Sequence, residues 1–384
     1  MPDLIAEFRL SHSMGGLLYA LPIIMIAAFS YPLGILSDRI GMEASIRYGI
    51  SIAFLFSLLR AFVGSFGPLV VCTGLFGIGF ALCFPNLPKL VKEKFPPRYS
   101  GAATGAYTAA LPLGTGLAII LTRRILPLIG TWRHVLLLMS LATVPVVLLW
   151  WIGFRPPVSR RKGLKNCLLP ETSDFNEGNN RAGRLPASLL ICGLLLALLN
   201  MIFYCTIGWL PTYLTERAWP AARAATATSL ISFIEIPAIL LIPLLVDRVG
   251  RRRLAVISSF AWMSACSAVI SGAPSLAWFT IPCFGITLGG VFVLLLAIPV
   301  DLVEAKKVGR AAGIVISIGY AGALIGPPTA GYLRDLTGSF AGAFLATALI
   351  GVTAAGLSYW LPSSVPRTRA NEERANSAHS PGHG

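Results

Sequence analysis

The sequence has little charge and few acidic residues for its length. Of its 384 residues only 12% are charged, with 16 Asp and Glu against 31 Lys and Arg, while 55% are hydrophobic. A soluble domain carries roughly 25% charged residues, so this composition excludes a protein that folds in water. The stretch 254–300 contains no charged residue, although a helix needs only about 20 apolar residues to cross a bilayer. The composition therefore predicts a membrane protein.

Catalytic and metal-binding patterns are missing as well. The four histidines do not cluster on the predicted helices, and the sequence contains no G-x4-G-K-[ST], H-E-x-x-H or G-x-S-x-G. All cysteines but Cys167 lie in apolar stretches, without the spacing of metal ligands, where a small buried hydrophobe is the default interpretation. We therefore expect a protein that is not an enzyme and holds no metal or cofactor.

Long apolar runs dominate the rest of the chain and predict eleven transmembrane helices. Because they are continuously apolar, they do not fit the alternating strands of a membrane barrel. The run 254–300 holds two helices, with a turn at Gly272-Ala273-Pro274-Ser275. The other predicted helices are 10–37, 44–64, 61–88, 99–122, 134–154, 185–215, 224–246, 311–333 and 336–366.

The net charge of +15 is distributed unevenly along the chain. If the loop that contains Asp38 lies inside, most Lys and Arg fall in the inner segments, which fits the positive-inside rule. This distribution explains the excess of positive charge without a nucleic-acid partner, and we expect none. It predicts a multi-pass protein of the cell (inner) membrane with its central linker and C-terminus in the cytoplasm.

The predicted helices fall into two groups. Residues 1–154 form a bundle of five helices, 155–185 a hydrophilic cytoplasmic linker, 186–362 a bundle of six helices, and 363–384 a disordered cytoplasmic tail. The odd count predicts that the first helix of a duplicated unit is missing. Residues 2–11 read like a loop that follows a helix, so we expect a mis-set start, with a truncated gene product as the alternative.

A short polar signature recurs at the ends of two apolar runs. Asp38-Arg39-Ile40-Gly41 returns as Asp247-Arg248-Val249-Gly250, and the same offset separates Ala102-Ala103 from Ala311-Ala312. Internal repeats of membrane segments are typical of secondary transporters. The repeat therefore predicts a duplicated transport unit.

The segment from Gly34 to Gly41 resembles the loop motif G-x-L-x-D-R-x-G-R-[RK] of the major facilitator superfamily. The second copy keeps the core Asp-Arg-x-Gly-Arg-Arg but begins with Pro243, and the first copy ends in Met42-Glu43 in place of the basic pair. The resemblance implies a two-bundle helical fold and a gating role for the motif. The residues concerned are Gly34, Asp38, Arg39, Gly41, Asp247, Arg248, Gly250, Arg251 and Arg252.

Further segments narrow the resemblance. Tyr204 with 209–214 looks like the seventh helix of anion-transporting branches, 326–338 looks like the end of the eleventh helix, and 85–98 is similar to the cyanate-transporter-like branch. Two departures matter: Thr73 stands where much of the family has Arg, and the Gly-Pro of the antiporter pattern is not reproduced at 111–114. The resemblance thus favours a solute importer or symporter over a drug antiporter.

Asp38 and Asp247 lie at the expected cytoplasmic ends of helices. A carboxylate there can accept hydrogen bonds from the free N–H groups at a neighbouring helix N-terminus, an interaction worth about 0.3–1 kcal/mol. The family resemblance implies that such contacts latch an inner gate. The alternative is that both charges face water and lipid headgroups. Gly41 and Gly250 each allow a tight backbone turn.

Glu235 lies near the middle of a predicted membrane helix, and Thr228, Ser232 and Glu235 follow i, i+4, i+7 spacing on one face. An acid at bilayer depth is costly and tends to face a cavity or a partner. We expect it to carry a proton, and the alternative is a structural acid paired with another helix.

Several other polar residues are candidates for the pathway of a solute or proton. Arg60 either snorkels toward the outer interface or attracts anions. The remaining candidates either hydrogen-bond a small polar solute or join neighbouring helices. They are Asn200 and Tyr204, Tyr107 and Thr108, and Ser317 and Tyr320.

The sequence therefore predicts an all-α polytopic membrane protein with a major-facilitator-type two-bundle fold and 11 rather than 12 transmembrane helices. Its expected function is secondary active transport of a small solute, an anion, by alternating access. The expected partners are the solute, the lipid bilayer and protons as coupling ion, and the expected state is a monomer. The alternative is a transport-inactive truncated remnant or sensor of the same fold.

Overall fold

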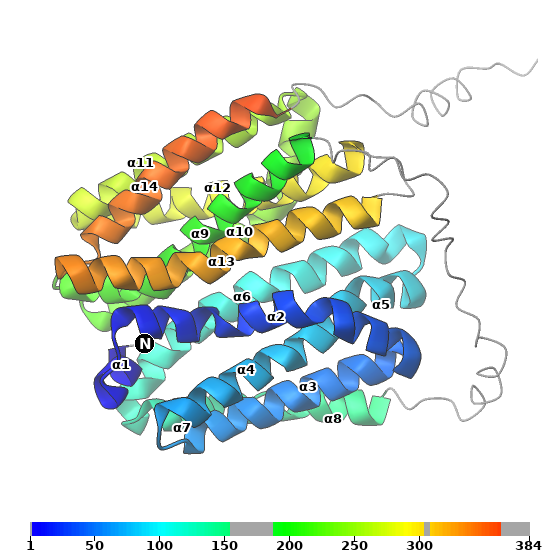
Figure 1. Ribbon diagram of the computed structural model, residues 1–384, viewed down its shortest axis with the longest axis horizontal. Coiled ribbons are helices and arrows are strands. Elements are labelled where there is room, and N and C mark those ends of the chain that lie inside the picture. The colour runs from blue at the N-terminus through cyan, green and yellow to red at the C-terminus, as the bar shows by residue number, and fades with distance from the viewer. Residues whose placement is uncertain (1, 154–186, 303–307, 362–384) are drawn as a thin grey trace, which may run out of the picture. The chain divides into compact units, whose positions relative to one another are not determined.

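The computed structural model describes residues 2–153, 187–302 and 308–361, and all regular elements in these ranges are helices (Figure 1). The predicted linker at 155–185 and tail at 363–384 lie outside the described residues. The elements are α1 (Pro2–Phe8), α2 (His12–Ile40), α3 (Met42–Leu59), η1 (Arg60–Phe62), α4 (Phe66–Cys83), η2 (Phe84–Asn86), α5 (Leu87–Lys94), α6 (Pro97–Ile129), α7 (Trp132–Leu141), α8 (Val144–Gly153), α9 (Ala187–Glu216), α10 (Ala221–Val249), α11 (Arg252–Gly272), η4 (Pro274–Leu276), α12 (Ala277–Leu302), α13 (Val308–Thr337), α14 (Ala341–Leu357) and η6 (Ser358–Trp360).

Within the described ranges, 11 helical segments are long and apolar enough to cross a membrane, which confirms the predicted number. The expected break inside 254–300 is confirmed too: α11 ends at Gly272 and the next span begins at Pro274. Proline has no backbone N–H and restricts the residue before it, so the helix stops there. The span Trp132–Gly153 consists of two helices, α7 and α8.

Large apolar side chains cover the outer surfaces of the helices. Leu128 is 85% exposed and Phe279 is 75% exposed, and many other leucines and valines are similarly uncovered. A soluble protein rarely exposes apolar patches larger than a few hundred Å², whereas in a bilayer these side chains contact lipid tails. These outer surfaces are therefore suited to contact with lipid tails.

By packing, the chain divides into two compact units. One comprises Met1–Ile24, Ala102–Gly130 and Ser188–Gly384, and the other comprises Met25–Gly101 and Thr131–Ala187. Residues 12–24 of α2 and most of α6 thus pack with α9–α14, and the rest of α2 packs with α3, α4, α5, α7 and α8. The sequence-based bundle boundaries at 1–154 and 186–362 remain a prediction.

In the smaller unit, α3 and α4 touch backbone to backbone at two glycines. A Cβ on Gly79 would lie 2.6 Å from the Ala53 nitrogen and 2.7 Å from the Gly49 oxygen, and a Cβ on Gly49 would lie 2.6 Å from the Gly79 oxygen. In a bilayer, helices associate through such close packing because lipid tails provide no hydrophobic drive. The two glycines therefore hold this helix pair together.

Gly79→Ala is expected to destabilise the protein by about 1–3 kcal/mol, because the added methyl meets backbone atoms that cannot move aside. Gly67→Ala in the same helix is the matched control, since a Cβ there meets nothing within 4 Å. The control should be neutral or slightly stabilising because alanine is the better helix former. Thermal midpoints of the two variants in the same detergent measure the difference, and equal midpoints would contradict the packing argument.

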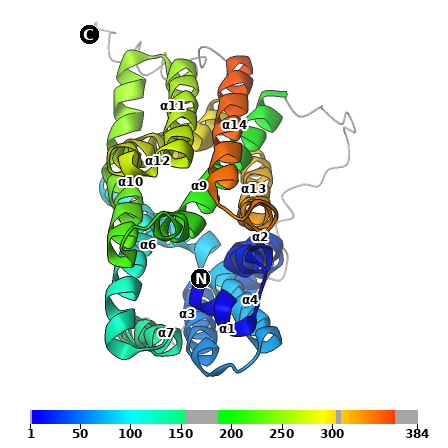
Figure 2. The ribbon, with the colours of Figure 1, turned by 90° about the vertical axis from the view of Figure 1, so that its left-hand side faces the viewer.

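In the larger unit, neighbouring helices run side by side in the pairs α10–α12 and α11–α14 (Figures 1 and 2). A Cβ on Gly285 of α12 would lie 2.7 Å from the Ile231 oxygen, and one on Gly289 would lie 2.8 Å from the Glu235 oxygen. Ser264 of α11 donates a hydrogen bond of 2.7 Å to the Ala348 oxygen of α14. The two glycines thus let α10 and α12 approach backbone to backbone, and the serine bond joins α11 to α14.

Candidate transport site

Both copies of the repeated motif form tight turns at glycine, as predicted. Gly41 has φ +93 and is the single residue between α2 and α3, and Gly250 has φ +72 at the C-cap of α10. Only glycine adopts this left-handed backbone without strain. Gly34 on α2 has open space around its Cα, so close packing does not explain its presence.

In the first copy, three contacts join the α2–α3 turn to the segment η2–α5. Lys89 donates a hydrogen bond of 2.7 Å to Asp38, Ser37 donates one of 2.7 Å to the Asn86 side chain, and Lys94 lies 2.6 Å from Glu43. The serine and asparagine are buried, whereas the two ion pairs are partly exposed. Asp38 therefore contacts an ammonium group in the first turn of α5, where backbone N–H groups were expected.

The second copy is described only in part. Asp247 lies in the last turn of α10, but its side chain is outside the described part of the structure. Arg248 is exposed in the same turn, which favours the helix because a cation there interacts with the helix dipole. Arg251 precedes the first residue of α11, Arg252. Arg39 of the first copy is likewise exposed, in the last turn of α2.

Among the charged candidates whose side chains the structure describes, Glu235 is the one that is buried. It is 9% exposed on α10, and its Oε2 has no hydrogen-bond partner among the described residues. The backbone of α12 packs directly against it, since a Cβ on Gly289 would lie 3.0 Å from its Cγ. A buried carboxyl group without a partner costs free energy, so its retention needs an explanation.

Tyr204 is the tyrosine near Glu235, and two further tyrosines neighbour Tyr204. Tyr204 of α9 interacts electrostatically with Tyr320 of α13, Tyr19 of α2 and Glu235. The rings of Tyr19 and Tyr204 have their centroids 6.4 Å apart in an edge arrangement. We call Glu235, Tyr19, Tyr204 and Tyr320 the acid–tyrosine cluster. Tyr19 was missed by sequence reasoning, because nothing in its own helix distinguishes it from a lipid-facing tyrosine.

Other predicted candidates make helix contacts. The Asn200 amide donates a hydrogen bond of 3.0 Å to the Gly319 oxygen, which joins α9 to α13. Thr228 and Thr108 each donate to a carbonyl one turn earlier in their own helix, at 2.9 and 2.8 Å. Ser232 is buried and its hydroxyl has no partner among the described residues.

The remaining polar candidates differ in exposure. Tyr107 on α6 is partly buried, and Ser317 on α13 is exposed one turn before Tyr320. Of the pairs predicted by spacing, the structure therefore brings Tyr204 near both Glu235 and Tyr320 and assigns Asn200 to a contact between helices.

Arg60 does not snorkel freely. Its guanidinium lies 4.2 Å from the centroid of Phe76 and donates a hydrogen bond of 3.1 Å to Ser57, whose hydroxyl is 2.8 Å from that of Ser140. Its Nε is buried without a partner in the described residues. The side chain thus lies among α3, α4 and α7.

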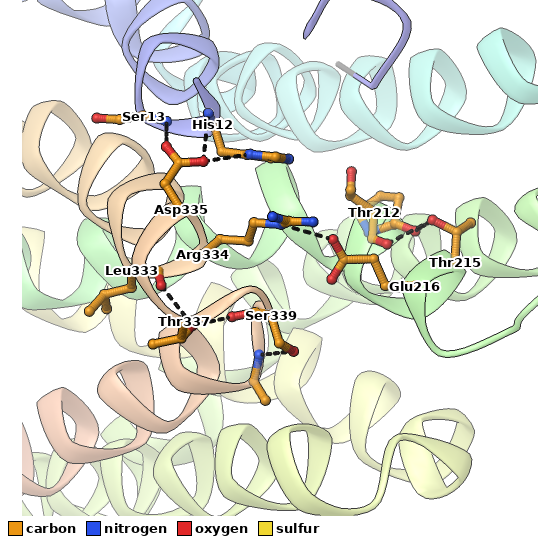
Figure 3. Close-up of polar contacts among 12 residues, drawn as sticks. His12, Ser13, Thr212, Thr215, Glu216, Leu333, Arg334, Asp335, Thr337 and Ser339 are labelled. Atoms are coloured by element: carbon orange, nitrogen blue, oxygen red, sulfur yellow. Dashed lines mark hydrogen bonds and ion pairs between the residues drawn. The ribbon is translucent and has the colours of Figure 1, made fainter. Parts of the chain in front are cut away.

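At the other end of α2, an aspartate from α13 holds the helix N-terminus (Figure 3). Asp335 accepts hydrogen bonds from the backbone nitrogens of His12 and Ser13, both at 3.1 Å, and lies 2.7 Å from His12 Nδ1. The His12 ring packs against Trp209 and Phe340, with centroids 6.0 and 5.7 Å away. Carboxylates favour helix N-termini because free N–H groups and the dipole meet them there.

A second contact lies beside this one. Arg334 donates a hydrogen bond of 3.1 Å to Glu216 at the end of α9 (Figure 3). The Trp209 indole donates one of 2.9 Å to the Pro327 oxygen of α13. Together these contacts hold α2, α9 and α13 at the end of the helices away from the repeated motif. We call this group the α2–α13 clamp. Its long-range pairing, between residues 12 and 335, was not visible in the sequence.

No group of His, Cys, Asp and Glu side chains in the described ranges could hold a metal ion.

Comparison with known proteins identifies the family. A model described as Major Facilitator Superfamily matches residues 1–241 and 189–381. The chain belongs to the major facilitator superfamily and is a multi-pass membrane transporter of small solutes. The predicted resemblance is confirmed.

Curated relatives cover most of the chain. It is 28% identical over 360 residues to an uncharacterized transporter of Bacillus subtilis (strain 168), which covers 91% of this chain and 85% of the relative. It is 27% identical to the 2-nitroimidazole transporter of Escherichia coli (strain K12), over 90% of this chain and 86% of the relative. It is 23% identical to the cyanate transport protein of the same organism, over 88% and 85%.

Among solved structures, the fold is similar to a bacterial homolog of the human lysosomal transporter Spinster, with a TM-score of 0.74. The sequence identity is 15%, and the match covers 93% of this chain and 90% of the other. At this identity the likeness shows the fold alone.

Proposed function

We propose that this transporter moves a small organic or inorganic anion together with a proton, by alternating access. It would act as a monomer in the cell membrane, with its central linker and C-terminal tail in the cytoplasm. The observation that carries the proposal is Glu235, a buried carboxyl group with an unpartnered oxygen near Tyr204, which in turn neighbours Tyr19 and Tyr320. An ionisable group inside a membrane bundle is functional by default, because its cost must be offset.

The tyrosines can provide hydrogen-bond partners for a carboxyl group that gains and loses a proton inside the bundle. A phenol both donates and accepts hydrogen bonds, so it can contact either the neutral or the charged acid. Tyr204 of α9 neighbours Glu235, and Tyr19 of α2 and Tyr320 of α13 neighbour Tyr204, so movement of these helices changes the polar network that includes the acid. This arrangement supports coupling of protonation to conformation.

Anion specificity is supported by the relatives and by charge. Several relatives are named for anions: cyanate, hexuronate and gallate. The chain carries a net charge of +15, and Arg60 is a partly buried cation without a carboxylate partner in the described residues. A relative named for 2-nitroimidazole shows that a nitroheteroaromatic compound belongs in the same test.

The test is uptake into proteoliposomes that contain the full chain. Radiolabelled cyanate, gallate, glucuronate, 3-(3-hydroxyphenyl)propionate and 2-nitroimidazole would be offered with the outside one pH unit more acidic than the inside, and again without a gradient. Gradient-driven accumulation of an anion supports the proposal. Accumulation of 2-nitroimidazole alone contradicts anion specificity. No flux of any compound would favour the remnant or sensor.

The repeated motif is proposed to act as the inner gate. At its first copy, the pair Asp38–Lys89 is exposed and is worth only about 0–1 kcal/mol of stability, so its presence is better explained by movement than by folding. Asn86 holds Ser37 beside it, so the end of α2 and the start of α5 move as one piece when the gate opens.

Asp38→Asn is expected to slow transport about tenfold while changing the unfolding free energy by less than about 1 kcal/mol. Glu43→Gln is the matched control, because it weakens the neighbouring pair with Lys94 without touching the motif aspartate. Initial uptake rates and thermal midpoints are compared for the two variants. Equal slowing in both would mean that charge at this end matters and that the motif aspartate has no special role.

A further inference from the structure

An arginine and two tryptophans form a cluster where α10 and α12 begin. The rings of Trp219 and Trp278 are stacked with centroids 5.9 Å apart and planes 30° apart. The Arg223 guanidinium lies 5.1 Å from the first ring and 5.5 Å from the second. Each such contact is worth about 0.5–1 kcal/mol at an exposed site, so two rings hold this cation in place.

The cluster has hydrogen-bond donors and no matching acceptors. Arg223 has no carboxylate or carbonyl partner among the described residues, in contrast to Arg334, which pairs with Glu216. The Trp278 Nε1 is buried and unpartnered in the same ranges. Pro220, the N-cap of α10, provides no side-chain acceptor for the first N–H groups of the helix. The guanidinium also keeps the planar, five-donor edge that matches phosphate and carboxylate oxygens.

Apolar side chains flank this donor-rich cluster. Leu276 is 47% exposed and Phe279 is 75% exposed, one on each side of Trp278 along the chain. A soluble anion would gain nothing from them, whereas the acyl chains of a lipid would cover them. Tryptophan is also enriched at the level of lipid headgroups. The surroundings therefore suit a ligand with an oxyanion next to hydrocarbon chains.

We propose that Arg223, Trp219 and Trp278 bind the phosphate of an anionic phospholipid at this end of the bundle. The guanidinium edge contacts the phosphate oxygens, the tryptophan faces hold the guanidinium in orientation, and Leu276 and Phe279 contact the acyl chains. This site shares no residue with the acid–tyrosine cluster and does not depend on the proposed transport mechanism.

Native mass spectrometry of the full chain in detergent tests the proposal. Dioleoylphosphatidylglycerol, dioleoylphosphatidylcholine and inorganic phosphate are each titrated against the wild type and three variants. Arg223→Ala removes the cation, Arg223→Lys keeps the charge but not the planar fork, and Arg217→Ala removes a neighbouring exposed arginine that lies over Tyr213. Arg223 is exposed, so its variants should fold, and thermal midpoints without lipid verify this.

The expected result is one tightly bound phosphatidylglycerol whose affinity falls about tenfold in Arg223→Ala, less in Arg223→Lys, and not in Arg217→Ala. Equal affinity in Arg223→Ala and wild type would overturn the proposal. Equal affinity for phosphatidylcholine and phosphatidylglycerol would show that the cluster does not select an anionic lipid and only anchors the protein at the interface, which overturns the proposal. Displacement of the lipid by inorganic phosphate at millimolar concentration would show a soluble-anion site, which also overturns it.

Discussion

Glu235→Gln is expected to abolish accumulation driven by a proton gradient while leaving exchange of substrate across the membrane intact. A gradient of one pH unit is worth about 1.4 kcal/mol, which corresponds to about tenfold accumulation for each proton moved. Glutamine keeps the size and the hydrogen-bonding capacity of the buried group but cannot exchange a proton. The variant should therefore equilibrate substrate without concentrating it.

The measurement compares gradient-driven uptake with counterflow in the same proteoliposomes. Glu93→Gln is the matched control, because Glu93 is exposed on α5 and the change is chemically identical. Tyr204→Phe gives a second reading: removal of one phenol beside Glu235 should lower the rate without removing the dependence on the gradient. If Glu235→Gln accumulates substrate as well as the wild type, the acid is structural and the coupling proposal fails.

Asp335→Ala is expected to loosen the N-terminal turn of α2 and to destabilise the protein by about 1–2 kcal/mol, the cost of removing a helix cap. The aspartate receives two backbone hydrogen bonds and contacts the His12 ring, so its loss affects three groups at once. The Asp335–His12 pair is partly exposed, so solvent screens the interaction between its charges. The expected loss of stability therefore comes mainly from the two backbone hydrogen bonds.

Hydrogen exchange resolves this effect locally. Amides at the start of α2 should exchange about tenfold faster in Asp335→Ala, since 1.4 kcal/mol is a factor of ten in an opening equilibrium. Asp335→Asn retains one acceptor oxygen and should lie between the wild type and the alanine variant. Glu216→Gln is the control, because it weakens the adjacent pair with Arg334 and leaves the α2 N-terminus capped. Unchanged exchange in Asp335→Ala would mean that the contacts of Asp335 contribute nothing to the order of α2.

The sequence by itself determined the class of protein and the number of helices long enough to cross a membrane. Hydropathy along the chain predicted eleven spans, and proline and glycine predicted the break near Pro274 and the turns at Gly41 and Gly250. These features are local, because the cost of exposing backbone and charge to lipid is set by each segment separately. The repeated motif then identified the family.

The contacts between helices required the tertiary structure. Helices such as α9 are apolar all round, so their sequence does not show which face meets a neighbour and which meets lipid. The partner of Asp38, the presence of Tyr19 beside Tyr204, and the pairing of His12 with Asp335 all depend on how the helices are rotated. Close packing at glycines such as Gly79 and Gly289 likewise acts between different helices, so it too is visible only in the tertiary structure.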